Sequence, residues 1–202
     1  ENLHGSSTNN AAVSASFDRL DSPQHLKCLQ LIAAVRKFYE DQEAPQISLC
    51  KLGSTSSMAL QGVEPADTSQ ALPDVLREQL EEEYEDLVPY KGRYLTARAL
   101  HFAIWLASTS IPGEENVNYC EDVKILLWAK AEPSSCGIYM RKKEAVRLPA
   151  LHIAAGLGVI EAMAALLDEL PAERVQDEID RYCMCGDRPF YCALHDAVFN
   201  GK

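Results

Sequence analysis

The sequence lacks several features that would point directly to a function. No window approaches the ~20 consecutive apolar residues that a membrane-spanning helix requires. Neither a phosphate-binding Gly-x-x-x-x-Gly-Lys-Ser/Thr loop nor a dinucleotide-binding Gly-x-Gly-x-x-Gly loop is present. Bases are few, with 19 Lys and Arg against 30 Asp and Glu, and nucleic-acid binding needs a positive surface. We therefore expect neither a membrane nor a nucleic-acid partner.

The chain also lacks a visible secretion signal. Its seven cysteines are an odd number and are scattered along the sequence, unlike a disulfide framework. This pattern predicts reduced thiols and a cytoplasmic or nuclear location.

With 202 residues, 47% of them hydrophobic, the chain is long enough for one substantial domain with appendages. Its charge is uneven, because residues 1–90 carry 15 acidic and 6 basic side chains whereas residues 91–202 carry 15 and 13. The polar segment 1–20 can bury little and is predicted to be a flexible tail.

Residues 21–90 are predicted to form a two-helix N-terminal cap with a long connecting loop. Ser22 and Pro23 are typical of a helix start, and apolar residues then recur at helical spacing as far as Tyr39. Segment 42–70 predicts an irregular connection with a short extended piece at 47–52. A second helix is predicted from Leu72 until Pro89 ends it.

The second predicted helix carries seven acidic residues against one base, Arg77. A charge run of this kind is usually a solvated helix face. The alternative is an acidic docking surface for a basic partner.

The tripeptide Ala-Leu-His occurs three times, beginning at Ala99, Ala150 and Ala193, and each copy is followed two residues later by alanine. The middle copy continues through glycines into a second apolar helix from about Ile160 to Glu169. Two short helices joined by a turn cannot bury both faces alone, so such units stack on neighbours.

At these residues the sequence resembles the ankyrin repeat, whose unit reads Thr-Pro-Leu-His-x-Ala-Ala-x-x-Gly and continues with Glu-Val-Val-x-Leu-Leu-Leu. The leucines of successive copies are 51 and 43 residues apart, against a family period of about 33, which places insertions in the loops. The matching residues are Leu100, His101, Ala103, Glu121, Val123, Ile125, Leu126 and Leu127; Leu151, His152, Ala154, Ala155, Gly158, Glu161, Leu166 and Leu167; and Leu194, His195, Ala197 and Gly201.

The resemblance implies an all-α fold: an ankyrin-like helical repeat solenoid with the N-terminal helical cap. Residues 91–202 would form about two and a half repeats, the last incomplete. The family's Thr-Pro is replaced by Arg98-Ala99, Pro149-Ala150 and Cys192-Ala193, so the usual threonine cap is missing. The three histidines would occupy equivalent positions along the stack, which favours a structural role over a shared site.

The loops between repeats would project as fingers, and family resemblance implies a binding module rather than an enzyme, with no cofactor. The segment "MRKKEAVR" makes one finger basic, which suits a partner protein with an acidic segment. A solvated loop, or one neutralised by the acidic helix, is the alternative. The expected partner-binding residues are Tyr139, Arg141, Lys142, Lys143, Arg147 and Phe199.

The segment before the third copy offers a metal-binding alternative. Cys183, Cys185, Cys192 and His195 could close a tetrahedral zinc site, although Cys-x-Cys is a tight spacing. Ordinary loop cysteines are the competing interpretation. A helix is also predicted around Val175, Ile179 and Tyr182.

The third copy stops at Gly201-Lys202, which would expose its inner helix around Val198 and Phe199. We expect this edge to pack on further sequence or on another chain. The predicted function is a scaffold or adaptor that binds a protein through the fingers and the concave face. The alternatives are a non-catalytic recognition segment of a larger enzyme, channel or regulatory protein, and a zinc-stabilised structural unit.

Overall fold

The computed structural model describes residues 22–41, 72–109 and 119–201. The predicted tail at 1–20, the connection at 42–70 with its extended piece, and most of the first-repeat insertion lie outside these residues. In chain order, the elements are α2 (Pro23–Glu40), α3 (Asp74–Glu81), β1 (Tyr84–Tyr90), β2 (Arg93–Ala97), α4 (Ala99–Thr109), α5 (Tyr119–Trp128), β3 (Cys136–Arg141), β4 (Glu144–Pro149), α6 (Ala150–Leu157), α7 (Ile160–Asp168), α8 (Ala172–Asp180), β5 (Tyr182–Cys185), β6 (Arg188–Cys192) and α9 (Ala193–Phe199).

The expectation of an all-α helical solenoid is wrong. Six strands form one antiparallel sheet in the order β1-β2-β3-β4-β5-β6, so the chain has an α/β fold. The segments expected to be finger loops are β-hairpins, and neighbouring hairpins pair with each other through β2–β3 and β4–β5. Lateral pairing of this kind satisfies backbone groups that isolated loops would leave to water.

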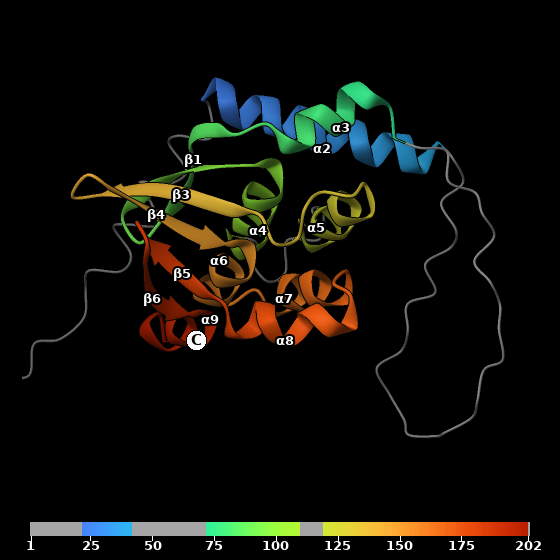
Figure 1. Cartoon of the computed structure of the whole chain (residues 1–202). Coiled ribbons are helices and arrows are strands. Elements are labelled where there is room, and N and C mark those ends of the chain that lie inside the picture. Colours follow the sequence, from blue (N-terminus) through green and yellow to red (C-terminus); the bar gives the residue numbers. More distant parts are fainter. Residues whose placement is uncertain (1–21, 42–71, 110–118, 202) are drawn as a thin grey trace, which may run out of the picture.

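Each hairpin leads directly into an Ala-Leu-His helix, which defines three hairpin–helix units. The first unit contains β1, β2, α4 and α5; the second contains β3, β4, α6 and α7; the third contains β5, β6 and α9. In Figure 1 the strands lie on the left, α4 and α6 further in, and the outer helices α5 and α7 on the right, with α9 below β6.

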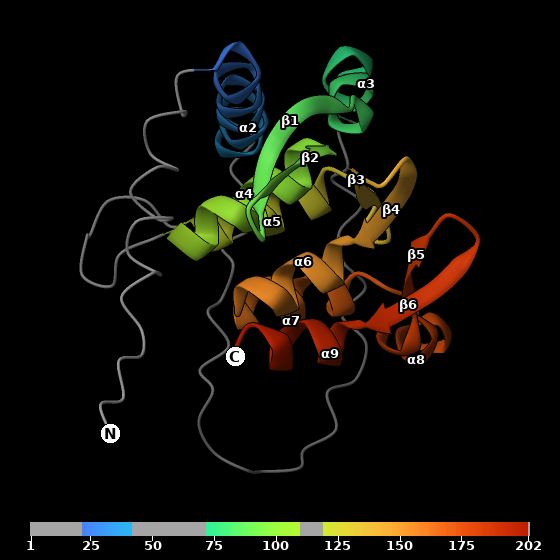
Figure 2. The ribbon, with the colours of Figure 1, turned by 90° about the vertical axis from the view of Figure 1, so that its left-hand side faces the viewer.

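Figure 2 shows the units stacked in sequence order, with α2 and α3 at one end and α9 at the other. Buried apolar side chains form a core that joins α2 to the first two units. The largest members include Phe102, Leu95, Ile104, Leu126, Leu148 and Ile153. A smaller cluster of Leu151, Ala155 and Ala193 joins the second unit to the third.

The three hairpins close through two-residue turns with left-handed backbone. Lys91 and Gly92 have φ of 49° and 71°, Lys142 and Lys143 have 49° and 76°, and Gly186 has 59°. Such turns match the right-handed twist of the strands, but they normally carry Asn or Gly. Because the second turn carries two lysines instead, the sequence shows no recognisable turn signal for this hairpin.

The predicted helix from Leu72 to Pro89 is only half correct. Helix α3 ends at Glu81, and the residues that follow form β1, with a register shift between Tyr84 and Val88 and a positive φ of 51° at Asp86. This β-bulge places Tyr84 and Leu87 on the buried side three residues apart, a spacing that imitates a helix. The predicted acidic helix face is therefore shared between α3 and β1.

The other helix predictions fit more closely. Of the two glycines in the middle copy, Gly158 ends α6 in left-handed conformation (φ 75°), whereas Gly156 lies inside the helix. Helix α8 occupies the segment around Val175 and Ile179 but stops before Tyr182, which starts β5. In the described part of the chain, no helix combines the length and apolar character needed to cross a bilayer.

Candidate functional site: the exposed α9 face and the hairpin ends

The third unit exposes more apolar surface than the units before it. Leu194, Val198 and Phe199 on α9 are 71%, 67% and 73% exposed, and Phe190 on β6 is 46% exposed. Leu194 and Val198 are four residues apart and lie on one side of the helix. We call the surface made by Leu194, Val198 and Phe199, together with the free edge of β6, the exposed α9 face.

The opposite side of α9 is buried against the second unit. Ala193 and Ala197 pack with Leu151 and Ala155 of α6. Leu151 holds the same motif position as Leu194, yet it is only 2% exposed. Equivalent residues are thus covered in the second unit and uncovered in the third, where the described residues supply no covering helix.

Asp196 anchors α9 to both preceding units. This residue is fully buried, and its Oδ1 accepts a hydrogen bond from the Tyr90 hydroxyl at 3.0 Å and pairs with the Lys91 Nζ at 2.5 Å. Its Oδ2 lies 3.3 Å from His152 Nδ1. Burial first, and then the Asp196 carboxylate, raise the pKa of Tyr90, so this hydroxyl stays protonated as a donor. The sequence analysis did not predict this network. Its only signal was that Asp196 follows the motif histidine, where the other two units have Phe102 and Ile153.

Cations of successive hairpins lie over aromatic rings of the next hairpin. The Arg93 guanidinium is 5.2 Å from the Tyr139 ring centre, and the Arg141 guanidinium is 4.8 Å from that of Phe190. Lys91 Nζ reaches past the second hairpin and lies 5.4 Å from the ring centre of Tyr191 in the third. These cation–π contacts leave the hairpin ends both basic and aromatic.

The structure brings some of the predicted partner-binding residues together. Tyr139 and Arg141 lie on β3, Lys142 and Lys143 form the exposed turn, and Arg147 is exposed on β4. Phe199 lies apart from them on α9. Phe190 and Arg93 belong to the same surface but were missed, because nothing in the sequence shows that neighbouring hairpins pair.

The cysteines and histidine of the zinc alternative are not assembled into one site. Cys192 Sγ is 3.0 Å from His195 Nδ1, but Cys183 is buried and Cys185 Sγ donates to Glu144 at 3.3 Å. Burial raises the pKa of Cys183 to about 11, and the hydrogen bond to Glu144 raises that of Cys185. Within residues 22–41, 72–109 and 119–201, no group of three or more His, Cys, Asp or Glu side chains is placed to hold a metal ion.

The histidines of the three motifs lie in successive layers of the stack, as predicted for structural residues. His101 and His152 are fully buried, and each contacts the backbone of the following unit. His195 is exposed, and the part of the chain that the structure describes provides no partner for its Nε2.

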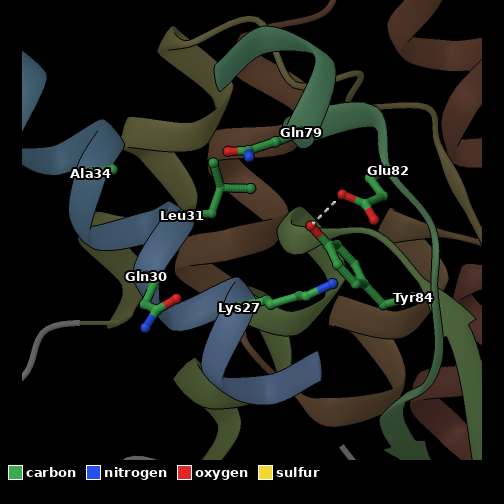
Figure 3. A pocket seen from close by; sticks show the side chains of 7 residues that line it. All are labelled: Lys27, Gln30, Leu31, Ala34, Gln79, Glu82 and Tyr84. Atoms are coloured by element: carbon green, nitrogen blue, oxygen red, sulfur yellow. Dashed lines mark hydrogen bonds between the residues drawn. The ribbon is translucent and has the colours of Figure 1, made fainter. Parts of the chain in front are cut away.

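A pocket of about 320 Å³ lies between α2, α3 and the start of β1. Figure 3 shows its lining: Lys27, Gln30, Leu31, Ala34, Gln79, Glu82 and Tyr84. The Tyr84 hydroxyl donates to Glu82 at 3.1 Å, and burial raises the pKa of this tyrosine. The lining contains no histidine, cysteine, serine or threonine, so it lacks the usual nucleophile–base pair.

Comparison with known proteins gives no match, whether to protein-family models, to curated sequences or to solved structures.

Proposed function

We propose that this protein is a non-enzymatic interaction module that binds another protein through the exposed α9 face and the neighbouring hairpin ends. One observation carries the proposal: Leu194 is 71% exposed although its counterpart Leu151 is 2% exposed. Three large apolar side chains within six residues of one helix form a patch of the kind that marks protein–protein contacts.

The hairpin ends supply a charged part of the same proposed interface. Arg93, Arg141, Lys142 and Lys143 project from adjacent hairpins of a chain whose net charge is −11. Lys142 and Lys143 keep a backbone conformation that costs a non-glycine residue about 1–2 kcal/mol each. A basic and aromatic surface of this kind favours a partner with an acidic segment.

A binding role is favoured over catalysis by what the described residues place together. The pocket lining carries no nucleophile–base pair, and the Cys192–His195 pair lies apart from this pocket. A recognition segment of a larger protein would use the same surfaces. The dispersed cysteines do not favour the zinc-stabilised unit.

The resemblance of the Ala-Leu-His segments to ankyrin repeats stays a proposal about these motifs, and it supports a binding role because such repeats bind proteins. We also propose a cytoplasmic or nuclear location. This location agrees with six free cysteines among the described residues.

Photo-crosslinking tests the proposed function. A photoreactive phenylalanine analogue replaces Phe199 in the full chain, and matched variants carry it at Ile160 and Val75, which are 73% and 66% exposed on α7 and α3. We expect a discrete protein adduct in cells from position 199 alone. Reversing Arg141, Lys142 and Lys143 to glutamate should weaken it, whereas Lys37→Glu on α2 should not. No adduct, or the same adducts from all three positions, would contradict the proposal.

A further inference from the structure

Consecutive units are joined through the same three components. Between the first and second units, β2 pairs with β3 at Thr96 and Ile138. Helix α4 packs on α6. His101 Nε2 donates to the carbonyl of Ser135, the residue before β3, over 3.3 Å.

The junction between the second and third units repeats this arrangement. Strand β4 pairs with β5 at two positions, and α6 packs on α9 through Leu151 and Ala155 against alanines. His152 Nε2 donates to the carbonyl of Arg181, the residue before β5, over 2.9 Å. Each junction therefore combines a strand pair, a helix pair and a histidine-to-backbone hydrogen bond.

The third unit presents all three components without a partner in the described ranges. β6 is at the edge of the sheet, Leu194 and Val198 are exposed where Leu151 and Ala155 are covered, and His195 is exposed. The third unit thus repeats the strand edge, the apolar helix face and the imidazole donor that form the two existing junctions. Together they constitute a docking surface for a third junction.

We propose that the exposed α9 face accepts a hairpin–helix segment of a partner protein. The partner adds a strand antiparallel to β6, packs a helix with small residues four apart on Leu194 and Val198, and offers the carbonyl before its strand to His195 Nε2. This inference rests on the proposed function and specifies how the partner is held.

The hydrogen-bond partner of His195 Nδ1 specifies one residue of the partner helix. His195 Nδ1 accepts the backbone N–H of Cys192 at 3.3 Å, as His101 Nδ1 accepts that of Arg98 at 3.2 Å. His152 has no such donor because the equivalent residue, Pro149, lacks an N–H, and its Nδ1 meets Asp196 instead. The third unit thus resembles the first. Its partner should carry an apolar residue, like Ile153 of the second unit, where Asp196 stands in the third.

A second copy of this chain is poorly suited to be the occupant. The first unit's equivalent alanines, Ala99 and Ala103, are fully buried. Helix α2 packs against this unit, with the His25 ring stacked 5.2 Å from Phe102 and its Nε2 2.8 Å from the Leu87 carbonyl. One end of the stack is therefore covered by the chain's own helix, and the other is exposed.

A fusion tests whether the surface accepts such a segment. A copy of residues 135–157 is joined after Lys202 of the full chain through a flexible glycine–serine linker, which gives an effective concentration of about a millimolar. We expect amide hydrogen exchange of the β6 segment 188–192, followed as one peptide, to slow at least tenfold. Leu194→Asp in the chain, or an aspartate in place of Ile153 in the copy alone, should restore the original rates. Unchanged exchange in the fusion would overturn the inference.

Two further measurements identify the occupant. The partner peptide cross-linked at position 199 should map to a strand–turn–strand–helix segment; an adduct with a loop or an acidic tail would overturn the inference and leave the proposed function intact. Light scattering of the unfused chain should give a monomer. Self-association that Leu194→Asp abolishes would identify a second copy and overturn the inference.

Discussion

Three histidines occupy the same motif position and have different hydrogen-bond partners. His101 accepts a backbone N–H at Nδ1 and donates from Nε2, so one neutral tautomer satisfies both bonds. His152 faces a carboxylate at Nδ1 and a carbonyl at Nε2, so both of its nitrogens face acceptors. A single residue, Pro149, accounts for this difference because it removes the local donor.

Acid should weaken the fold through His101. Burial lowers the pKa of this imidazole to about 4, below the value of about 6.5 in an unfolded chain. Between these values the unfolded state binds more protons, so the free energy of unfolding falls as the pH drops from about 6.5 to 4. The shift corresponds to ~3 kcal/mol. Denaturant unfolding at pH 7.0 and 4.5 should show a smaller loss in His101→Gln; equal losses would contradict the assignment.

Gly156 is required by a close approach rather than by its backbone angle. A Cβ built there meets the Tyr90 hydroxyl, which is buried and held by Asp196, and lies 3.1 Å from Asn200 Nδ2. Gly156→Ala should therefore destabilise the protein by about 1–3 kcal/mol, although alanine favours helices. Thermal or urea unfolding measures this loss. Adding Tyr90→Phe removes the clashing oxygen and should recover part of it; a double variant no more stable than Gly156→Ala would exclude this contact as the cause.

At the scale of elements, hairpins and helices rest on different interactions. Each Ala-Leu-His helix is fixed by side chains that pack between units, whereas each hairpin is paired internally and gains a further one or two backbone pairs where the next hairpin lies beside it. Within the described residues, β6 pairs with a strand on one side only, and α9 packs against a helix on one side only.

Leu151 and Leu194 hold the same motif position, and they provide a matched pair for testing whether α9 is covered on one side only. Truncating the buried leucine in Leu151→Ala should cost about 2–5 kcal/mol, since it leaves a cavity between α6 and α9. The equivalent Leu194→Ala should change stability by no more than about 0.5 kcal/mol. Urea unfolding of both variants decides the point. Similar losses would mean that Leu194 is covered in solution.

At the scale of the whole molecule, the stack is asymmetric. Helix α2 covers the first unit with buried Cys28, Leu31, Ile32 and Val35, and the third unit is exposed. Complementary surfaces at opposite ends of a stack allow a head-to-tail contact between copies. A contact of this kind that does not close into a ring generates open chains of subunits. In the described residues α2 is the element that blocks this contact.

Releasing α2 should convert the protein into a self-associating one. Ile32→Asp with Val35→Asp places charges in the buried face of α2 and should expose the front of the first unit to the α9 face of another copy. Light scattering should show mass increasing with concentration. Adding Leu194→Asp should return the variant to a monomer. Aggregation that is unchanged by Leu194→Asp would argue against complementary ends.

The sequence by itself determined where helices form and which residues recur. Helical spacing located α2 and α8 because it is a local property of consecutive residues, and the repeated motif located α4, α5, α6 and α7. The repeated motif placed three histidines at equivalent positions and identified α9 as exposed, although β1 was mistaken for helix because its bulge imitates that spacing.

Only the tertiary structure decided the sheet, the Asp196 network and the covered end. Strands of different units pair once stacking brings them together, and the turn lysines gave no local signal. Asp196 meets Tyr90 across 106 residues of sequence. Its burial with Lys91 and His152 depends on three units arriving at one point, which no local pattern encodes.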